Sequence, residues 1–226
     1  MSTLPHLLLA LFILPPLAHA VDRTINPALN AQLKLDATNL DRHATLSNDE
    51  AWRFDFPSQQ KYTFSPGSVV NANAATFPAL TGIGMTIAML NLGPCAMLTP
   101  HAHPRATNVV VAITGNTTSW MVGENGVGTV RVDLVAGILT IFPMGSLHAM
   151  QNNGCENAQL VSALNSEDTG TINYLNSLYQ LPHDMIRAAF GDAGLDVDEL
   201  GKGIPAVGTG SVLGSDECLK RCGLNR

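Results

Sequence analysis

Two histidines separated by one residue, His101 and His103, are the residues whose types and spacing could most readily do chemistry. They follow a short apolar run, residues 96–98, and precede Pro104. In an extended strand, residues two apart point to the same face and lie about 7 Å apart, so both imidazoles could reach one metal ion. A helix would spread the same pair around its circumference. The alternative is a polar loop with two incidental histidines, and a second element must decide between them.

Such a second element lies further along the chain. Gly137, Pro143, Gly145, His148 and Asn152 follow one another with five, one, two and three residues between them. Proline and glycine at this spacing predict a tight turn, after which His148 would begin the returning strand with its imidazole facing inward. Of the seven histidines, two lie in the first twenty residues, and three of the other five lie in these two elements. This concentration favours a metal site over an incidental pair.

Other chemistry is less well supported by the residue pattern. Arg105 follows the histidines and could hold a substrate carboxylate, but a turn or a surface ion pair is the alternative. Ser146 lies near His148, yet no orienting acid is evident, which disfavours a hydrolase triad. Several methionines lie on or beside expected strands, where they are predicted to line the protein interior. They are Met85, Met89, Met97, Met121, Met144 and Met150.

The composition describes one domain rich in strands and turns. Of 226 residues, 46% are hydrophobic and 13% are charged, against about 25% charged residues in a usual soluble domain. The net charge of −6, without a cluster of lysine and arginine, argues against nucleic acid as a partner.

Residues 1–20 are predicted to be a secretory signal peptide. A short apolar run, residues 7–14, is followed by two prolines and a small-residue end at Ala20, after which cleavage is expected. The run is shorter than the ~20 apolar residues of a membrane span, so no membrane anchor is expected. We therefore expect a secreted, extracellular protein.

Export would place the four cysteines in an oxidising compartment. We expect Cys95 to pair with Cys155, stapling neighbouring strands. Cys218 and Cys222 lie four residues apart, which permits a local bridge without establishing it. The tripeptide that begins at Asn116 is a glycosylation sequon that export would make usable.

The order of predicted elements indicates an all-β protein. Residues 21–56 are expected to form a partly helical N-terminal arm, with alternating aromatic residues over 52–64 predicting the first strands. Residues 57–168 contain short strands separated by Gly, Pro and Asn, which predicts a sandwich or barrel without βαβ crossovers. Residues 169–200 are expected to be helical, one helix ending at Gly191, and 201–226 form a tail carrying Cys218 and Cys222.

Taken together, the two histidine elements resemble the two conserved boxes of the cupin superfamily, and residues 101–107 closely resemble the germin-like branch. Residues 153–155, 160–170 and 218–222 look like the fungal spherulin-type secreted members. The resemblance implies a single jelly-roll β-barrel, a C-terminal helical region used in homo-oligomer contacts, a small-molecule substrate and commonly manganese. The activities that it implies are oxalate oxidation and superoxide dismutation.

One position departs from the germin pattern, in which a glutamate stands where this chain has Asn108. The expected ligand set is therefore His101, His103, His148 and Asn108, whose amide oxygen can ligate but brings no charge. Without an anion, the set should bind manganese less tightly and relatively favour zinc, copper, iron or nickel. Two functions stay open: a secreted metal-dependent oxidoreductase, or a non-catalytic wall, stress or storage cupin with a structural or vestigial metal.

Overall fold

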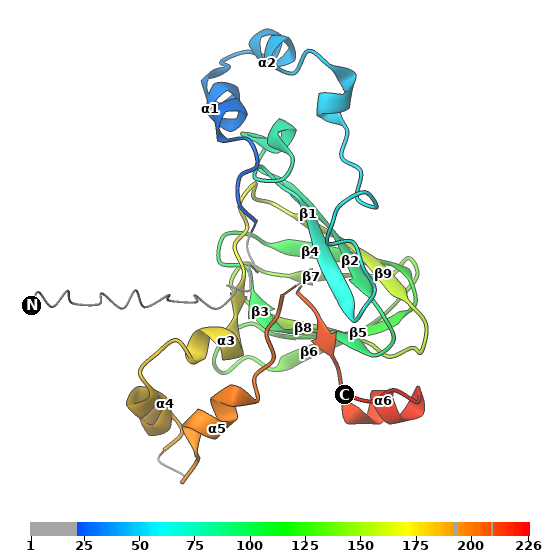
Figure 1. Cartoon of the computed structure of the whole chain (residues 1–226), viewed down its shortest axis with the longest axis vertical. Coiled ribbons are helices and arrows are strands. Elements are labelled where there is room, and N and C mark those ends of the chain that lie inside the picture. Colours follow the sequence, from blue (N-terminus) through cyan, green and yellow to red (C-terminus); the bar gives the residue numbers. More distant parts are fainter. Residues whose placement is uncertain (1–21, 192–193, 209) are drawn as a thin grey trace, which may run out of the picture.

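The computed structural model describes residues 22–191, 194–208 and 210–226, so the predicted signal peptide lies outside the described residues. The strands are β1 (Gly67–Ala72), β2 (Thr86–Leu92), β3 (Ala96–Ala102), β4 (Asn108–Thr114), β5 (Asn116–Val122), β6 (Thr129–Val135), β7 (Leu139–Phe142), β8 (Leu147–Asn152), β9 (Ala158–Leu164), β10 (Ile172–Asn173) and β11 (Val212–Leu213). They form two antiparallel sheets that face each other (Figure 1). The orders are β1-β2-β9-β4-β7 and β10-β3-β8-β5-β6, and β11 also pairs with β3. The all-β prediction is confirmed.

Alternating side chains form the core between the two sheets. On β9, for example, Leu160, Ser162 and Leu164 are buried, while the residues between them are partly exposed. This two-residue period is the one that an extended strand imposes. The aliphatic and aromatic core includes Leu90, Leu92, Leu98, Val110, Leu134, Phe142, Met150, Leu160 and Leu164.

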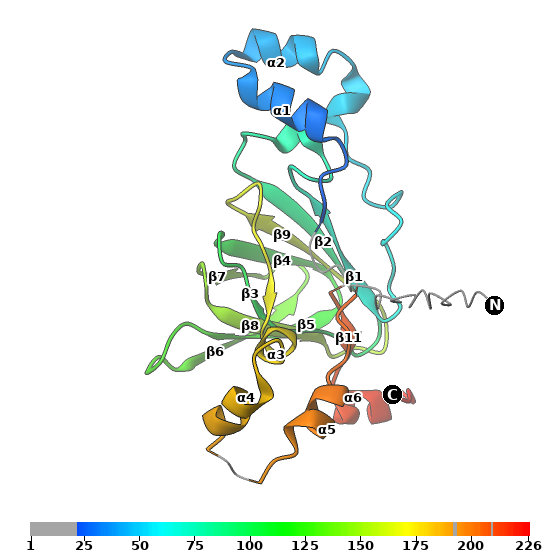
Figure 2. The same cartoon turned by 60° about the vertical axis from the view of Figure 1, so that its left-hand side comes forward.

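The helices lie outside this core. They are α1 (Pro27–Leu35), α2 (Asn39–Thr45), α3 (Tyr174–Leu178), α4 (His183–Ala189), α5 (Val197–Lys202) and α6 (Asp216–Arg221), with 3-10 turns η1 (Asp49–Trp52) and η2 (Pro78–Leu80). Figure 2 shows α1 and α2 at one end of the paired sheets and α3 to α5 at the other. The helical region expected from residue 169 begins later, because Ile172 and Asn173 first pair with β3 as β10. Gly191 follows α4 with φ +72, a conformation that glycine adopts without strain.

The predicted early strands over residues 52–64 are wrong. Trp52 ends η1, and no strand occurs among residues 53–66. The aromatic rings pack on each other instead: Phe54 lies 4.8 Å from Phe56 and 5.5 Å from Phe77, measured between ring centroids. Alternation therefore reflects a local aromatic cluster beside the N-terminal helices. Pro57, which has no backbone N–H to donate, also weakens a strand there.

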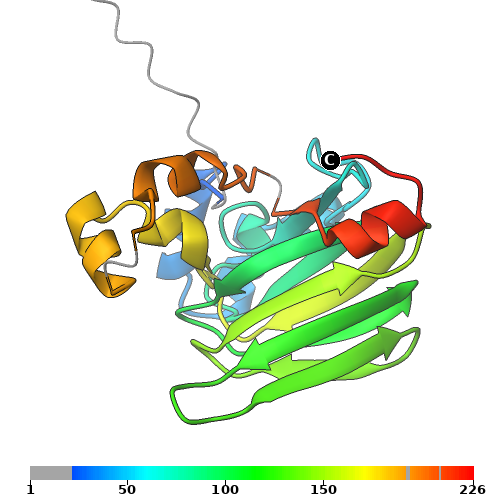
Figure 3. The same ribbon diagram turned by 90° about the horizontal axis from the view of Figure 1, so that it is seen from below.

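The predicted cysteine pairing is also wrong. Cys95 bonds Cys218, and Cys155 bonds Cys222, with Cα–Cα distances of 5.7 and 5.2 Å. Cys218 lies in α6 and Cys222 caps its C-terminal end, so residues four apart present both thiols on one side of the helix. The helix lies against one side of the sheets (Figure 3). There Cys218 reaches Cys95, just before β3, and Cys222 reaches Cys155 in the loop between β8 and β9. The two bonds therefore fix the C-terminal tail to the β-structure.

Removing the Cys155–Cys222 bond by the double substitution Cys155→Ser and Cys222→Ser should lower the free energy of unfolding by about 4 kcal/mol. The bond joins residues 67 apart, and the estimate follows from the chain entropy that such a cross-link removes from the unfolded state. Urea unfolding of the oxidised proteins measures the effect. Peptide mapping without reductant should recover Cys95 joined to Cys218 in both proteins; a Cys95–Cys155 peptide in the unsubstituted protein would contradict the pairing.

Candidate metal centre

Two adjacent antiparallel strands bring the three predicted histidines together. His101 on β3 lies directly opposite His148 on β8, and His103 follows just after the end of β3. The ring centroids of His101 and His148 are 4.2 Å apart, and those of His103 lie 5.2 Å from His101 and 5.3 Å from His148. One nitrogen from each ring lies within 4.8 Å of the other two. This spacing allows all three imidazoles to reach one ion.

Each of the three rings is oriented by a hydrogen bond from Nδ1 to a backbone carbonyl. His101 Nδ1 lies 2.7 Å from the oxygen of Thr99, and His148 Nδ1 lies 3.0 Å from that of Ser146. A carbonyl only accepts, so Nδ1 carries the proton and Nε2 keeps its lone pair for a metal. The third ring follows the same rule.

The remaining ring makes its bond to a distant part of the chain. His103 Nδ1 lies 2.8 Å from the carbonyl oxygen of Gly170, in the segment that leads to β10. The Nε2 atom of His148 is buried and has no hydrogen-bond partner among the described residues. A buried polar atom without a partner is costly unless a ligand satisfies it. The donor set therefore fits a divalent transition metal.

Burial keeps all three imidazoles neutral at neutral pH. Desolvation lowers the pKa of His148 to about 4, and the hydrogen bond to the backbone carbonyl of Ser146 opposes part of this effect. Desolvation first, and then the neighbouring His148 and His103, lower the pKa of His101 well below its usual value. Desolvation likewise lowers the pKa of His103. Neutral imidazole is the form that coordinates metals.

The turn before β8 explains the position of His148. The Ser146 amide donates to the carbonyl oxygen of Pro143 at 3.0 Å, and Gly145 has φ +79. The positive φ at the third turn position is typical of a type II turn, so the predicted tight turn is confirmed. The Gly145 amide also donates to the His103 carbonyl at 3.1 Å, which ties the turn to the first histidine element. Phe142, before the turn, stacks on the His148 ring at 4.2 Å.

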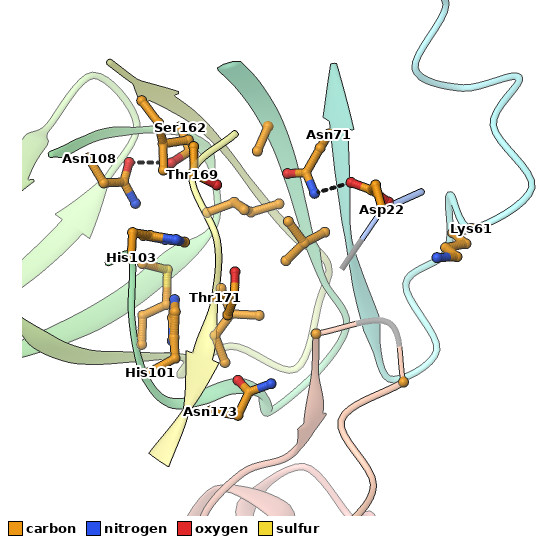
Figure 4. Close-up of a pocket in the computed structure, with 18 residues that line it drawn as sticks. Asp22, Lys61, Asn71, His101, His103, Asn108, Ser162, Thr169, Thr171 and Asn173 are labelled. Carbon is orange, nitrogen blue, oxygen red and sulfur yellow. Dashed lines mark hydrogen bonds between the residues drawn. The ribbon is translucent and has the colours of Figure 1, made fainter. Parts of the chain in front are cut away.

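Asn108 reaches the same pocket from the opposite sheet, as the first residue of β4. Its side-chain oxygen accepts a hydrogen bond from the Ser162 hydroxyl on β9. Figure 4 shows the amide nitrogen of Asn108 pointing to the side on which His103 lies. The oxygen expected to serve as a ligand is therefore engaged by Ser162, and the group that faces the histidines is a hydrogen-bond donor.

The pocket continues away from the histidines between the sheets. Its unfilled space measures about 790 Å³ when the part open to solvent is included. Aliphatic side chains, such as Leu90, Leu98 and Met150, line its interior. Asp22, Lys61 and Asn71 line the end opposite the histidines in Figure 4.

Two other candidates take no part in the pocket. Arg105 pairs with Asp168 at 2.7 Å on the surface, which is the ion-pair alternative considered for it. The Ser146 hydroxyl donates a hydrogen bond to the Pro143 carbonyl at 2.7 Å and so stabilises the turn.

Met150 lines the pocket, whereas Met144 is 62% exposed, so the expected interior position of Met144 is wrong.

Several pocket residues escape detection from sequence, Ser162 above all. Its only signal is its position, since it is a polar residue at an inward place of an otherwise apolar strand. The other polar residues that line the pocket come from segments far apart in the chain. They are Asp22, Lys61, Asn71, Thr169, Thr171 and Asn173.

The metal-free protein should lose stability as the pH falls from about 6.5 toward 4. In the unfolded chain these histidines take up protons near pH 6.5, whereas in the folded chain their lowered pKa values keep them neutral to lower pH. The neutral histidines therefore contribute fully to stability above pH 6.5, and this contribution is lost as the pH falls below it. For His148 alone, the loss reaches about 3 kcal/mol near pH 4.

Urea unfolding of the metal-free protein across this pH range measures that loss. Exposed carboxylates contribute to any acid effect, so His148→Gln is the matched control. The variant should show a shallower decline in the free energy of unfolding. An identical pH slope in the two proteins would contradict the assignment.

Comparison with known proteins agrees with this architecture. The sequence profile of the Cupin family matches residues 55–198. Spherulin-1A of Physarum polycephalum is 30% identical over 203 residues, which cover 88% of this chain and 81% of that protein. Germin-like protein subfamily 2 member 2 of Arabidopsis thaliana is 30% identical over 138 residues, covering 59% of this chain and 62% of that protein.

Solved structures share the fold at lower sequence identity. An oxalate oxidase in complex with the substrate analogue glycolate superposes with a TM-score of 0.63 and 21% identity, covering 69% of this chain and 82% of that chain. The Bacillus subtilis oxalate decarboxylase gives a TM-score of 0.62 and 18% identity, covering 71% of this chain and 40% of that chain. The two facing antiparallel sheets are thus a cupin jelly roll, and the chain belongs to the cupin family as a member of the germin and spherulin type.

Proposed function

We propose that this chain binds one divalent metal ion through the Nε2 atoms of His101, His103 and His148, and acts on a small molecule as a metal-dependent oxidoreductase. The observation that carries the proposal is the convergence of three neutral imidazoles, each held through Nδ1. The Nε2 atom of His148 is buried and has no partner within the part of the chain that the structure describes. A structural histidine ordinarily satisfies both ring nitrogens within the protein.

The chain's own residues would prepare the site in three ways. The carbonyl groups of Thr99, Gly170 and Ser146 hold the rings in one tautomer. The aliphatic interior beside them limits access of water, which strengthens electrostatic interactions within the pocket. A bound metal would supply Lewis acidity and, if it is iron, copper or manganese, redox chemistry.

The donor set guides the metals that we propose. Manganese is the metal that the germin likeness suggests, and it prefers oxygen ligands. Here three nitrogens converge and the Asn108 oxygen is engaged by Ser162. We therefore place iron, zinc, copper or nickel ahead of manganese for this chain.

The uncharged Asn108 supports a second candidate function. Three neutral imidazoles and no carboxylate leave a metal's positive charge uncompensated, which disfavours a higher oxidation state. A non-catalytic wall, stress or storage cupin would tolerate this, with the disulfides and a structural metal giving durability. Metal binding without turnover of oxalate, superoxide or other small molecules would favour this function.

We propose that the protein is secreted. Two disulfides fit an oxidising compartment, in agreement with the leader expected over residues 1–20. Asn116 is exposed at the start of β5, so its sequon is accessible to glycosylation. Among the described residues, no helix has the length and apolar character needed to span a membrane.

A homo-oligomer is part of the same proposal. The helices α4 and α5 expose Met185 (58%) and Leu200 (45%), and Phe190 beside them is 47% exposed. Exposed apolar side chains on protruding helices are candidates for an association surface. Light scattering on the protein as it elutes from a size-exclusion column measures the mass of the oligomer.

Calorimetric titration of the metal-free full-length secreted protein with zinc and with cobalt(II) tests the function. We expect one ion per chain for each metal. Binding that leaves the histidine ring resonances unshifted in NMR spectra of the zinc-loaded protein would contradict the proposed ligand set.

A further inference from the structure

We infer that the four cysteines form a redox-dependent zinc site. When a dithiol reductant opens both disulfides, the freed thiolates bind one zinc ion and keep α6 attached to the sheets. Four thiolates in a tetrahedral arrangement are a common donor set of structural zinc centres. The site shares no residue with the histidine pocket, so this inference stands or falls independently of the proposed function.

The two disulfides lie side by side, which gathers four sulfur atoms in one place. The Sγ atoms of Cys95 and Cys222 are 3.5 Å apart, although each is bonded to a different partner. The Sγ atoms of Cys95, Cys218 and Cys222 all lie within 4.8 Å of one another, and Cys155 is bonded to Cys222. With zinc–sulfur distances of about 2.3 Å, a tetrahedral centre places its sulfurs about 3.8 Å apart. The four thiols therefore need only separate within their bonded pairs to surround an ion.

Backbone hydrogen bonds hold the cysteine-bearing segments together independently of the disulfides. The Cys95 amide donates to the carbonyl of Gly154, the neighbour of Cys155, at 3.2 Å. The Gly214 amide, just before α6, donates to the Cys95 carbonyl at 2.7 Å. Leu219 of α6 is 3% exposed and packs in the same apolar cluster as Cys95. Because these contacts remain when the disulfides open, the thiols stay close together after reduction.

The helix α6 supplies two of the four thiolates and a compensating charge. Cys218 and Cys222 are one helical turn apart, the spacing at which a helix presents two zinc ligands on one face. Four thiolates around Zn²⁺ leave a net charge of about −2, which a nearby cation stabilises. The Arg221 guanidinium provides that cation, since its Nη2 atom lies 3.4 Å from the Sγ atom of Cys218.

The two steps balance in electrons and protons. Each disulfide takes two electrons and two protons from one dithiol, which becomes a disulfide itself, and two cysteine thiols result. Zinc then binds the four thiolates and displaces their four protons. Cys155 is exposed, whereas Cys95 and Cys218 are 0% and 1% exposed, so the reductant reaches the Cys155–Cys222 bond first.

The test uses cobalt(II) as a spectroscopic probe and the full-length His148→Ala variant, which weakens the histidine site. The protein is reduced with a phosphine, which does not add thiol ligands, in the absence of oxygen. We expect one cobalt per chain with an intense thiolate-to-cobalt absorption band in the near ultraviolet, which one equivalent of zinc abolishes. The same protein with both disulfides intact should show no such band. Absence of the band from the reduced protein would overturn the inference.

The matched variant adds Cys155→Ser and Cys222→Ser to the same background. Loss of a group that only orients a ligand costs about ten- to a hundredfold in metal affinity, so removal of two ligands should cost at least about a hundredfold. Equal zinc affinity in the two reduced proteins, measured by competition with a chromophoric chelator, would overturn the inference.

Trypsin tests whether zinc retains α6, because it cleaves after Lys220 and Arg221 within and at the end of this helix. The reduced metal-free protein should be cleaved there faster than the oxidised protein, and zinc should restore resistance. Zinc should give no protection when Cys155→Ser and Cys222→Ser are present. Cleavage that zinc does not slow in the reduced protein with all four cysteines would contradict the role of the ion in holding the helix.

Two charge substitutions on α6 test the electrostatic contribution. Arg221→Gln should weaken zinc binding by the reduced protein about tenfold, because it removes the cation beside Cys218. Lys220→Gln removes an equal charge from an exposed position of the same helix and should leave the affinity unchanged. Equal zinc affinities of the two variants would contradict the role assigned to Arg221.

Discussion

His148→Ala should lower the affinity for zinc or cobalt(II) by at least about a hundredfold. Loss of a group that only orients a metal ligand already costs about ten- to a hundredfold in affinity, and His148 would be a ligand itself. Its Nε2 atom is buried and has no hydrogen-bond partner among the described residues, as a metal ligand requires. Calorimetric titration of the metal-free variant measures the change.

The matched control is His183→Ala. His183 is half exposed and contacts Asp198 on the helical region, outside the pocket. The control should bind the metal as the unsubstituted protein does. Circular dichroism of both variants checks folding, because His148 stacks on Phe142 and its removal leaves a small cavity. Equal metal affinity in the folded His148→Ala variant and the control would show that His148 is not a ligand.

Asn108→Glu should raise the affinity for manganese by at least about tenfold and so reduce the ratio of zinc affinity to manganese affinity. The substitution places a carboxylate in the pocket beside His101 and His103. A hard anionic oxygen suits manganese and offsets the metal's charge, whereas zinc already gains most of its affinity from nitrogen ligands. Competition between manganese and zinc, read by metal analysis after dialysis, gives the ratio.

The control for this substitution is Asn108→Gln, which has the length of glutamate without its charge. It should leave the manganese-to-zinc ratio close to that of the unsubstituted protein. A rise in manganese affinity in both variants would show that side-chain length, and not charge, sets the preference.

The sequence was sufficient to predict the elements whose signals are local. Short runs separated by Gly, Pro and Asn predicted strands within residues 57–168, and Pro143 with Gly145 predicted the turn before His148. His101 and His148 face each other because β3 pairs with β8. The spacing of residues in the sequence only suggests this pairing. Local pattern failed over residues 52–64, because an alternating aromatic cluster has the same period as a strand.

Long-range contacts were the part that local patterns could not supply. Cys218 and Cys222 lie close in sequence, yet they bond cysteines 60 residues apart in the chain, Cys95 and Cys155, because α6 docks on the sheets. The Ser162 hydroxyl on β9 donates a hydrogen bond to the Asn108 oxygen on the neighbouring strand β4. The amide oxygen that was expected to bind a metal is therefore already engaged. Neither contact leaves a signature in the spacing of the residues that make it.

Metal analysis of the purified protein, compared with His148→Ala prepared in the same way, tests the central claim most directly. The account predicts one bound divalent metal ion per chain in the unsubstituted protein and its loss in the variant. Absence of a stoichiometric metal from the unsubstituted protein, both as purified and after incubation with zinc, cobalt, iron, copper, nickel and manganese, would contradict it.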